Sequence, residues 1–180
     1  MTDDLTVLAL AAGAGDRAAL SEFIRASQAP VWRFVARAAG VQFADDLAQE
    51  TYLRAIQALP GFQGRSSART WLLSIAHRVV VDRVRHEIGR PRLVGLTALE
   101  LDELAPVRPD HAGRIAVEQA LDGLAPERRT ALVLTQLMGF SYAEAAEICD
   151  CPVGTIRSRV ARARAELLAG LAVQPVARHS

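Results

Sequence analysis

Apolar and polar side chains repeat with helical spacing along most of the chain. Apolar residues recur every three or four positions within residues 43–59, 65–87, 126–138 and 152–168, as they do on one face of an amphipathic helix. No segment alternates apolar and polar residues with the period of two that predicts a β-strand. The pattern therefore predicts an all-α protein.

Prolines and glycines indicate where several of these helices begin and end. Pro30 and Pro126 suit the first turn of a helix, where a missing N–H costs nothing, and Gly139 suits a helix end. The segment PGFQG at 60–64 interrupts the pattern, and Ser66 or Ser67 can cap the helix that follows. We accordingly expect further separate helices at 16–26, 30–39, 43–59, 117–123 and 126–138.

The stretch from Ser141 to Leu168 reads as two helices joined by a tight turn. Ser141 and Glu144 have the spacing of a capping box at a helix start. Asp150 falls at the turn, because Asp tolerates a left-handed backbone better than most residues. Pro152 suits the first position of the second helix. The apolar stripe of that helix comprises Ile156, Val160, Ala163 and Leu167.

The second of these helices is basic on the side away from its apolar stripe. Four arginines and no acidic residue lie between Pro152 and Ala165, and Thr155 and Ser158 add hydroxyl groups. An apolar back with a basic, hydroxyl-bearing front is typical of a recognition helix in the DNA major groove. The alternative is a core helix whose charged face is only solvated. The single sign of the charge and the helix-turn-helix spacing favour DNA contact.

Residues 43–59 combine an apolar face with an acidic opposite face. The apolar face comprises Ala44, Ala48, Tyr52, Ala55 and Leu59. The opposite face carries acidic and amide side chains around a leucine: Asp46, Gln49, Glu50, Leu53 and Gln57. Such a face is often merely solvated, but a leucine directed away from the core indicates a docking surface for a basic partner. These residues alone leave both interpretations open.

A second basic block occupies residues 65–92, where seven arginines stand against Asp82 and Glu87. Its helix has an apolar stripe for the core, which comprises Ala68, Trp71, Leu72, Ile75 and Val79. Another line along the same helix comprises Ser74, Arg78, Val81 and Arg85. Trp71 could stack on a base, but its place in the apolar stripe favours packing. His77 and His86 lack neighbours that would make them ligands or catalysts, and we interpret them as surface or groove-lining groups.

The distribution of charge says more than the formal net charge of +1 over 180 residues. Residues 1–92 carry 12 arginines and 9 acidic residues, whereas residues 93–113 carry one arginine and 4 acidic residues. Residues 114–180 carry 8 arginines and 7 acidic residues. Two positive parts thus flank an acidic strip. We expect two small helical domains joined by a flexible acidic linker, the second domain being a helix-turn-helix.

Composition disfavours several classes of protein. No apolar run is long enough to span a bilayer, and Asp3 and Asp4 precede the first apolar run, so we expect a cytoplasmic protein without membrane insertion. Cys149 and Cys151 are too close for an unstrained disulfide and lack further zinc ligands, so we expect small buried thiols. No paired carboxylates, activated nucleophile or glycine-rich phosphate loop indicates an enzyme, and we expect no cofactor and no metal.

Three segments resemble conserved blocks of the extracytoplasmic-function (ECF) sigma factors of the sigma-70 family. They are DDLAQETYLRA at 45–55, SSARTWLLSIAHRVVVDRVR at 66–85 and SYAEAAEICDCPVGTIRSRVARARAEL at 141–167. The blocks occur in the order and at the spacing of the family and cover nearly the whole chain. The resemblance implies a sigma-2 domain at 1–92, a linker at 93–113 and a sigma-4 domain at 114–171. A tail at 172–180 is expected to fray.

The resemblance also implies roles for individual residues. A sigma factor joins core RNA polymerase and directs it to the −10 and −35 elements of a promoter. The residues implied to bind the clamp helices of the polymerase β′ subunit are Asp46, Gln49, Glu50 and Leu53. Those implied to contact the −10 element are Phe62, Gly64, Arg65, Ser66, Arg69, Arg78, Asp82 and Arg85. Those implied to contact the −35 element are Pro152, Thr155, Arg157, Ser158 and Arg162.

The partners implied by the resemblance are core RNA polymerase, through its β′ clamp helices and β flap, and promoter DNA. An anti-sigma factor is a further candidate. Relatives often carry Asn in place of Arg78 and a large apolar residue in place of Ala161, so promoter preference cannot be copied from them. The alternative is an autonomous helix-turn-helix regulator that acts without polymerase. It would explain residues 141–168 but neither the acidic face of 43–59 nor the basic block of 65–92.

Overall fold

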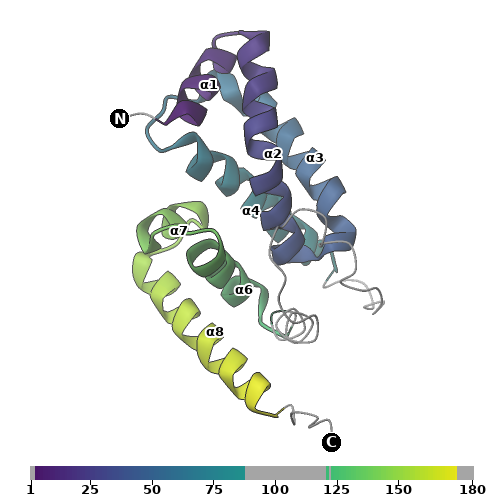
Figure 1. Ribbon diagram of the computed structural model, residues 1–180, viewed down its shortest axis with the longest axis vertical. Helices are drawn as coiled ribbons and strands as arrows, with labels where there is room; N and C mark the ends of the chain where they lie inside the picture. The colour runs from purple at the N-terminus through teal and green to yellow at the C-terminus, as the bar shows by residue number, and fades with distance from the viewer. Residues whose placement is uncertain (1–2, 88–120, 122, 174–180) are drawn as a thin grey trace, which may run out of the picture.

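The computed structural model describes residues 3–87, 121 and 123–173. All regular secondary structure in these ranges is helical, which confirms the all-α prediction. Figure 1 shows an N-terminal domain, α1–α4, with a smaller C-terminal domain, α6–α8, beside it. The expected linker at 93–113, nearly all of the helix expected at 117–123 and the tail beyond residue 173 lie outside the described residues.

The N-terminal apolar run forms a short helix, α1 (Asp4–Gly13). Asp3 caps it, because its carboxylate accepts a hydrogen bond from the Thr6 backbone N–H at 2.6 Å. The buried Thr6 hydroxyl in turn accepts from the backbone N–H of Ala68, at 2.8 Å, where α4 begins. Helix α1 therefore positions the start of α4, although the two lie far apart in sequence.

The two helices expected at 16–26 and 30–39 are a single helix, α2 (Arg17–Ala39), with Pro30 in its interior. The prediction of a helix start at Pro30 was wrong. Proline removes one hydrogen bond of the helix, the one that would reach back four residues. Burial on both sides of it offsets that loss, since Phe23, Val31 and Phe34 are almost fully buried in one core.

Helices α3 (Ala44–Ala58) and α4 (Ala68–Glu87) agree with the predicted pattern. Short 3₁₀ turns flank α3 at Val41–Phe43 and Leu59–Gly61. The predicted apolar faces form the core, with Tyr52 and Trp71 only partly buried. The Ser67 hydroxyl accepts from the Thr70 N–H at 3.1 Å, so Ser67 caps α4.

The C-terminal domain begins with α6 (Pro126–Leu132), which continues into a π-helical segment, Val133–Leu137. Pro126 is its first residue, as predicted, and Gly139 follows with a positive φ of 73°. Next come α7 (Tyr142–Ile148) and α8 (Val153–Val173). The two-helix unit predicted from 141–168 is confirmed.

Local details of this unit follow its sequence closely. Ser141 and Glu144 form the expected capping box, and Asp150 takes a left-handed conformation with φ 50°. Pro152 precedes the first residue of α8 instead of occupying that position, a difference of one residue. Most of the apolar stripe of α8 is buried: Ile156, Val160 and Ala163 are at most 2% exposed, and Leu167 is partly buried.

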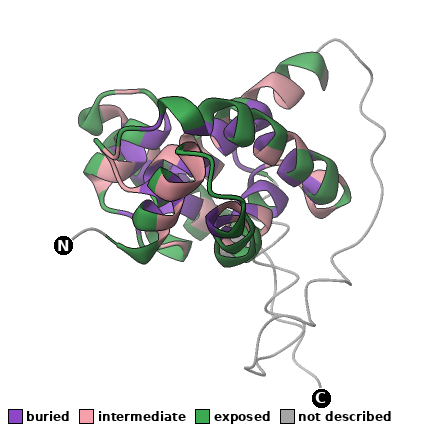
Figure 2. Cartoon of the chain, turned by 90° about the horizontal axis from the view of Figure 1, so that it is seen from above, coloured by how far each residue is buried: buried purple, intermediate pink, exposed green. Residues whose placement is uncertain are grey.

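The two domains pack against each other. Helix α4 contacts α7, and α2 contacts α6 and the π-helical segment. Figure 2 shows buried residues inside the helix packing and exposed residues on the outer helix faces. This packing brings parts of the predicted −10 region of the first domain against the second domain.

Candidate polymerase and promoter interfaces

The residues predicted to bind polymerase lie on the outward side of α3. Asp46, Gln49 and Leu53 are exposed, and Glu50 is half-buried. Leu53 is 52% exposed and Ile56, three residues further along the helix, is 40% exposed. We call this surface the α3 face. Sequence reasoning missed Ile56, although its spacing of three from Leu53 places both on one side of a helix.

Arg54 is a cation beside this acidic face. Its Nε donates to Glu50 Oε1 at 2.8 Å, and its Nη1 donates to Asp82 Oδ2 of α4, also at 2.8 Å. These two carboxylates raise the pKa of Arg54, Asp82 having the larger effect. Sequence reasoning missed Arg54, although its spacing of four from Glu50 is typical of a helical ion pair.

The loop from Phe62 to Arg69 has an apolar base and polar flanks. Phe62 is 9% exposed, and its ring centroid lies 4.9 Å from that of Trp71. Phe62 is therefore placed to support the loop from within. Gly64 has φ +67°, a conformation in which a side chain is strained. Arg65 is exposed and Ser66 is half-buried.

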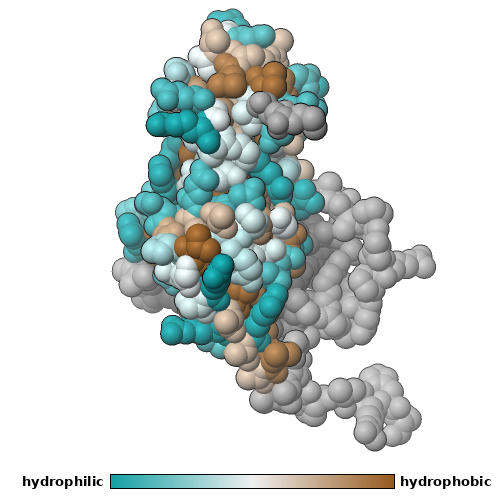
Figure 3. All heavy atoms as spheres, turned by 90° about the vertical axis from the view of Figure 1, so that its left-hand side faces the viewer, coloured by the Kyte–Doolittle hydropathy of each residue, from teal (hydrophilic) through white to brown (hydrophobic). Residues whose placement is uncertain are grey.

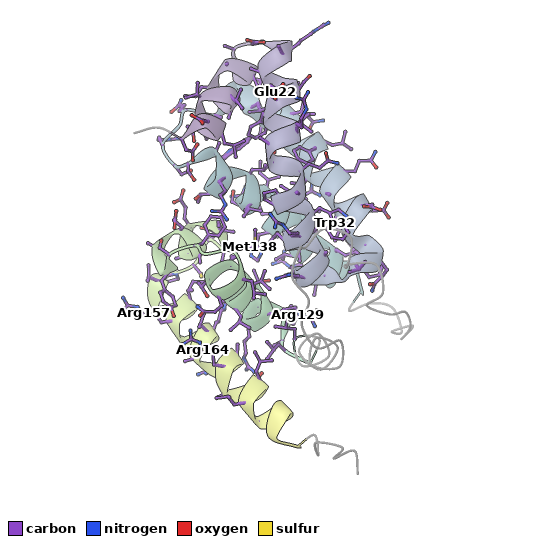
Figure 4. The ribbon with its side chains drawn as sticks, in the orientation of Figure 1. Glu22, Trp32, Arg129, Met138, Arg157 and Arg164 are labelled. Carbon is purple, nitrogen blue, oxygen red and sulfur yellow. The ribbon has the colours of Figure 1, made fainter. Side chains whose placement is uncertain are left out.

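Arg69, the last residue of the predicted −10 loop, contacts the C-terminal domain. Its guanidinium donates to the Met138 backbone oxygen at 2.8 Å, and its central carbon lies 4.1 Å from the centroid of the Phe140 ring. Figure 4 shows Met138 where the two domains meet. A residue predicted to contact DNA is thus engaged within the chain.

The remaining predicted −10 residues lie along α4. Arg78, Asp82 and Arg85 follow one another at spacings of four and three, so they share one side of the helix. Arg78 and Arg85 are exposed, whereas Asp82 is half-buried and paired with Arg54. Asp82 therefore connects this side of α4 to α3.

His77 differs from the expectation of a surface or groove-lining group. It is half-buried, and its Nδ1 has no hydrogen-bond partner among the described residues. The pKa of His77 is lowered to about 4, mainly by burial and also by the charges of Arg159 and Arg78, against the opposing effect of Glu127. Since Arg159 and Glu127 belong to the C-terminal domain, His77 lies near the domain junction and is neutral at pH 7.

The residues predicted to read the −35 element lie at the start of α8 and along its outer side. Pro152, Arg157, Ser158 and Arg162 are exposed, and Thr155 is half-buried. Two other arginines turn back to their own domain. Arg159 contacts the Cys151 sulfur at 3.7 Å, and Arg164 donates to the Gln136 side chain. Figure 4 shows Arg157 pointing away from the domain, whereas Arg164 lies toward α6.

The two cysteines occupy different environments. Cys149 is buried, as expected, and burial raises the pKa of its thiol to about 12, so it stays protonated. Cys151 is only half-buried. Among residues 3–87 and 123–173, no three histidine, cysteine or acidic side chains gather as a metal site would require. In the same ranges, no helix has the length and apolar character needed to cross a membrane.

Comparison with known proteins identifies the class to which this fold belongs. The family model for sigma-70 region 2 matches residues 23–88, and the model for sigma-70 region 4 matches residues 114–167. The chain belongs to the sigma-70 family and is an ECF RNA polymerase sigma factor. It joins core polymerase and directs promoter recognition and transcription initiation.

Two relatives are similar over most of the chain. The ECF RNA polymerase sigma factor SigC of Mycobacterium tuberculosis is 50% identical over 176 residues, covering 92% of this chain and 90% of that protein. The ECF sigma factor EcfG of Rhodopseudomonas palustris is 40% identical over 133 residues, covering 72% of each chain.

Two solved structures share the fold. CnrH, in complex with the cytosolic domain of CnrY, has a TM-score of 0.71 and 25% identity, covering 96% of this chain and 100% of that one. RpoE, in complex with the anti-sigma factor NepR from Bartonella quintana, has a TM-score of 0.70 and 26% identity. That comparison covers 87% of this chain and 98% of RpoE.

Proposed function

We propose a division of labour within this sigma factor. The α3 face binds the basic clamp helices of the polymerase β′ subunit, and residues 114–171 dock on the β flap. The 62–69 loop and α4 capture the opened −10 element, while α8 reads the −35 element. The observation that supports this assignment most strongly is the exposed row of Arg157, Ser158 and Arg162 on a helix whose back is buried.

Simple energy terms support this division. A bidentate arginine–guanine contact discriminates against a wrong base by about 1–3 kcal/mol, which suits readout of the −35 duplex by α8. Unstacking a −10 base costs a few kcal/mol, and stacking and phosphate contacts offset that cost. Core polymerase carries the catalytic chemistry, and the sigma factor itself is neither an enzyme nor a cofactor-binding protein.

The domain packing adds a conformational step to this function. Arg69 cannot keep its contacts with Met138 and Phe140 and also reach DNA with the same groups. We propose that the free chain is closed and that polymerase separates the domains, with the segment 93–113 as the tether. The protein acts in the cytoplasm. NepR, the anti-sigma factor bound to RpoE in one of the similar structures, makes an anti-sigma factor a candidate partner.

The polymerase contact can be tested with Asp46→Arg and Gln49→Ala. Both side chains are exposed on α3, so the fold should persist while affinity for core polymerase falls. Equilibrium binding of labelled chain to purified core measures the effect, and circular dichroism checks folding. Gln28→Ala, an exposed amide on α2, serves as the control. Unchanged affinity in folded Asp46→Arg protein would remove α3 from the polymerase interface.

A further inference from the structure

Arg54 connects two surfaces with different predicted partners. Its guanidinium holds Glu50, which belongs to the α3 face, and Asp82, which lies on the −10 side of α4. The three side chains are between 42% and 45% exposed, so they form a surface cluster. Figure 4 draws the side chains of α3 and α4 in this part of the N-terminal domain.

The hydrogen bonding of Asp82 conflicts with a role in reading DNA. A carboxylate can read a cytosine by accepting from its N4 amino group, but phosphates repel it. Asp82 Oδ2 already accepts from Arg54 Nη1, 28 residues away in sequence. Arg78 and Arg85, on the same side of α4, are exposed and carry the positive charge that binds DNA phosphates. Asp82 is thus directed toward α3.

The charge balance of the α3 face depends on this contact. Arg54 is positive and lies beside an acidic surface proposed to bind basic helices, so alone it would oppose docking. Together Glu50, Arg54 and Asp82 carry one net negative charge. Without the Asp82 charge the cluster would be neutral, and Arg54 would keep Glu50 as its single partner or extend toward polymerase.

We propose that Asp82 is a positioning residue of the polymerase interface, which acts by holding Arg54 away from the incoming basic partner. It does not contact the −10 element. This inference rests on the proposed docking role of the α3 face. It changes the role implied for Asp82 by family resemblance and adds Arg54 to the residues that govern assembly with polymerase.

The test measures two quantities for Asp82→Asn, Arg54→Gln and the double variant. The first is the equilibrium affinity of the full-length chain for purified core polymerase, at low and high salt. The second is base preference of the preassembled holoenzyme on fork-junction DNA with each −10 base varied. Glu22→Gln is the matched control, because Glu22 is an exposed acid paired with Arg25 on α2.

Asp82→Asn should weaken core binding by roughly two- to fivefold, the range that an exposed ion pair allows. High salt should reduce the difference, while −10 base preference stays unchanged. In the Arg54→Gln background, Asp82→Asn should have a smaller effect, because only the loss of its charge remains and there is no Arg54 for Asp82 to hold. Glu22→Gln should change neither quantity.

The inference is overturned by unchanged core affinity in Asp82→Asn, by an altered −10 base preference, or by an equal loss in the Arg54→Gln background. Asp46→Arg, measured in parallel, separates this inference from the proposed function. If Asp46→Arg weakens core binding and Asp82→Asn does not, the inference alone fails. If neither weakens it, the proposed α3 face fails as well.

Discussion

The arginines of α8 point in two directions, outward into solvent or back toward their own domain. Arg157 and Arg162 point outward, whereas Arg159 and Arg164 contact Cys151 and Gln136 of the same domain. The sequence alone counts four arginines on this helix and does not show which of them face the rest of the domain. Only the packing of α8 on α6 and α7 decides which of them can enter the major groove of DNA.

Arg157→Ala should therefore lower affinity for one promoter and relax preference at one −35 position, by about 1–3 kcal/mol. Arg164→Ala is the matched comparison on the same helix. Arg164 is exposed but bonded to Gln136, so we expect it to meet phosphate and no base; its loss should weaken binding to all duplexes alike and reduce the salt slope by about 1. Holoenzyme binding to promoters with single −35 substitutions measures both. Equal losses for both variants on every sequence would contradict the assignment of α8.

Burial of His77 near the domain junction should make the stability of the folded protein depend on pH. Its pKa falls from 6.5 in the unfolded chain to about 4 in the folded one, so the unfolded state binds the proton first. Stability should therefore be full above pH 6.5 and decrease as the pH falls toward 4, by up to roughly 3 kcal/mol. The groups that face His77 are Arg78 on its own helix, Arg159 on α8 and Glu127 on α6.

Replacement of His77 by Gln removes this titration but leaves the carboxylates, which also titrate in acid. The difference between the unfolding free energies of the wild type and His77→Gln, from urea titrations at each pH, isolates the effect of His77. That difference should change over the range from pH 6.5 to 4. Parallel pH profiles for the two proteins would show that His77 does not become buried on folding.

At the scale of elements, the sequence predicted helix caps correctly where the two hydrogen-bonding residues lie within three positions of each other. Ser141 and Glu144 close a capping box three residues apart, and Ser67 caps α4 through Thr70. Pro30 misled the prediction of α2, because burial of residues on both sides of it in the core outweighed a local signal. The contacts of Arg54 and Arg69 were not predictable, since Asp82 and Met138 lie 28 and 69 residues away.

Ser141→Ala should destabilise the C-terminal domain by about 1 kcal/mol, because it removes one half of the capping box. The Ser141 hydroxyl and backbone N–H lower the pKa of Glu144, so the stabilisation is present above the unfolded pKa of this group and is lost in acid. Urea unfolding at neutral pH measures the cost. Ser21→Ala, which removes an exposed hydroxyl within α2, should have little effect. Equal stability of the wild type and Ser141→Ala would contradict a stabilising role of the Ser141 cap.

At the scale of the whole molecule, the closed arrangement joins regions that DNA must reach separately. Arg69 bonds to Met138, and α4 packs on α7. Figure 3 shows polar and charged residues spread widely over one face of the molecule, with apolar residues in small separate patches. Among the described residues visible in this view, no broad apolar surface of the kind that a permanent partner would cover is present. The proposed opening by core polymerase would break these contacts between the domains.

Energy transfer between dyes on two exposed positions, Gln28 of α2 and Glu147 of α7, should report this opening. Transfer should be high in the free chain and fall when purified core polymerase binds. A dye pair within the N-terminal domain, on Gln28 and the exposed Asp4 of α1, controls for local effects of polymerase on the dyes. Unchanged transfer on binding would mean that the domains remain packed together in the holoenzyme.

The most direct test of this account is a gel shift on one cognate promoter with the chain alone, core polymerase alone and both together. We expect a sequence-specific complex only when both are present. The free chain should bind poorly, because its two DNA-binding parts are packed together and gain little from each other until polymerase fixes their spacing. Tight, sequence-specific binding by the chain alone would contradict the account and favour an autonomous helix-turn-helix regulator.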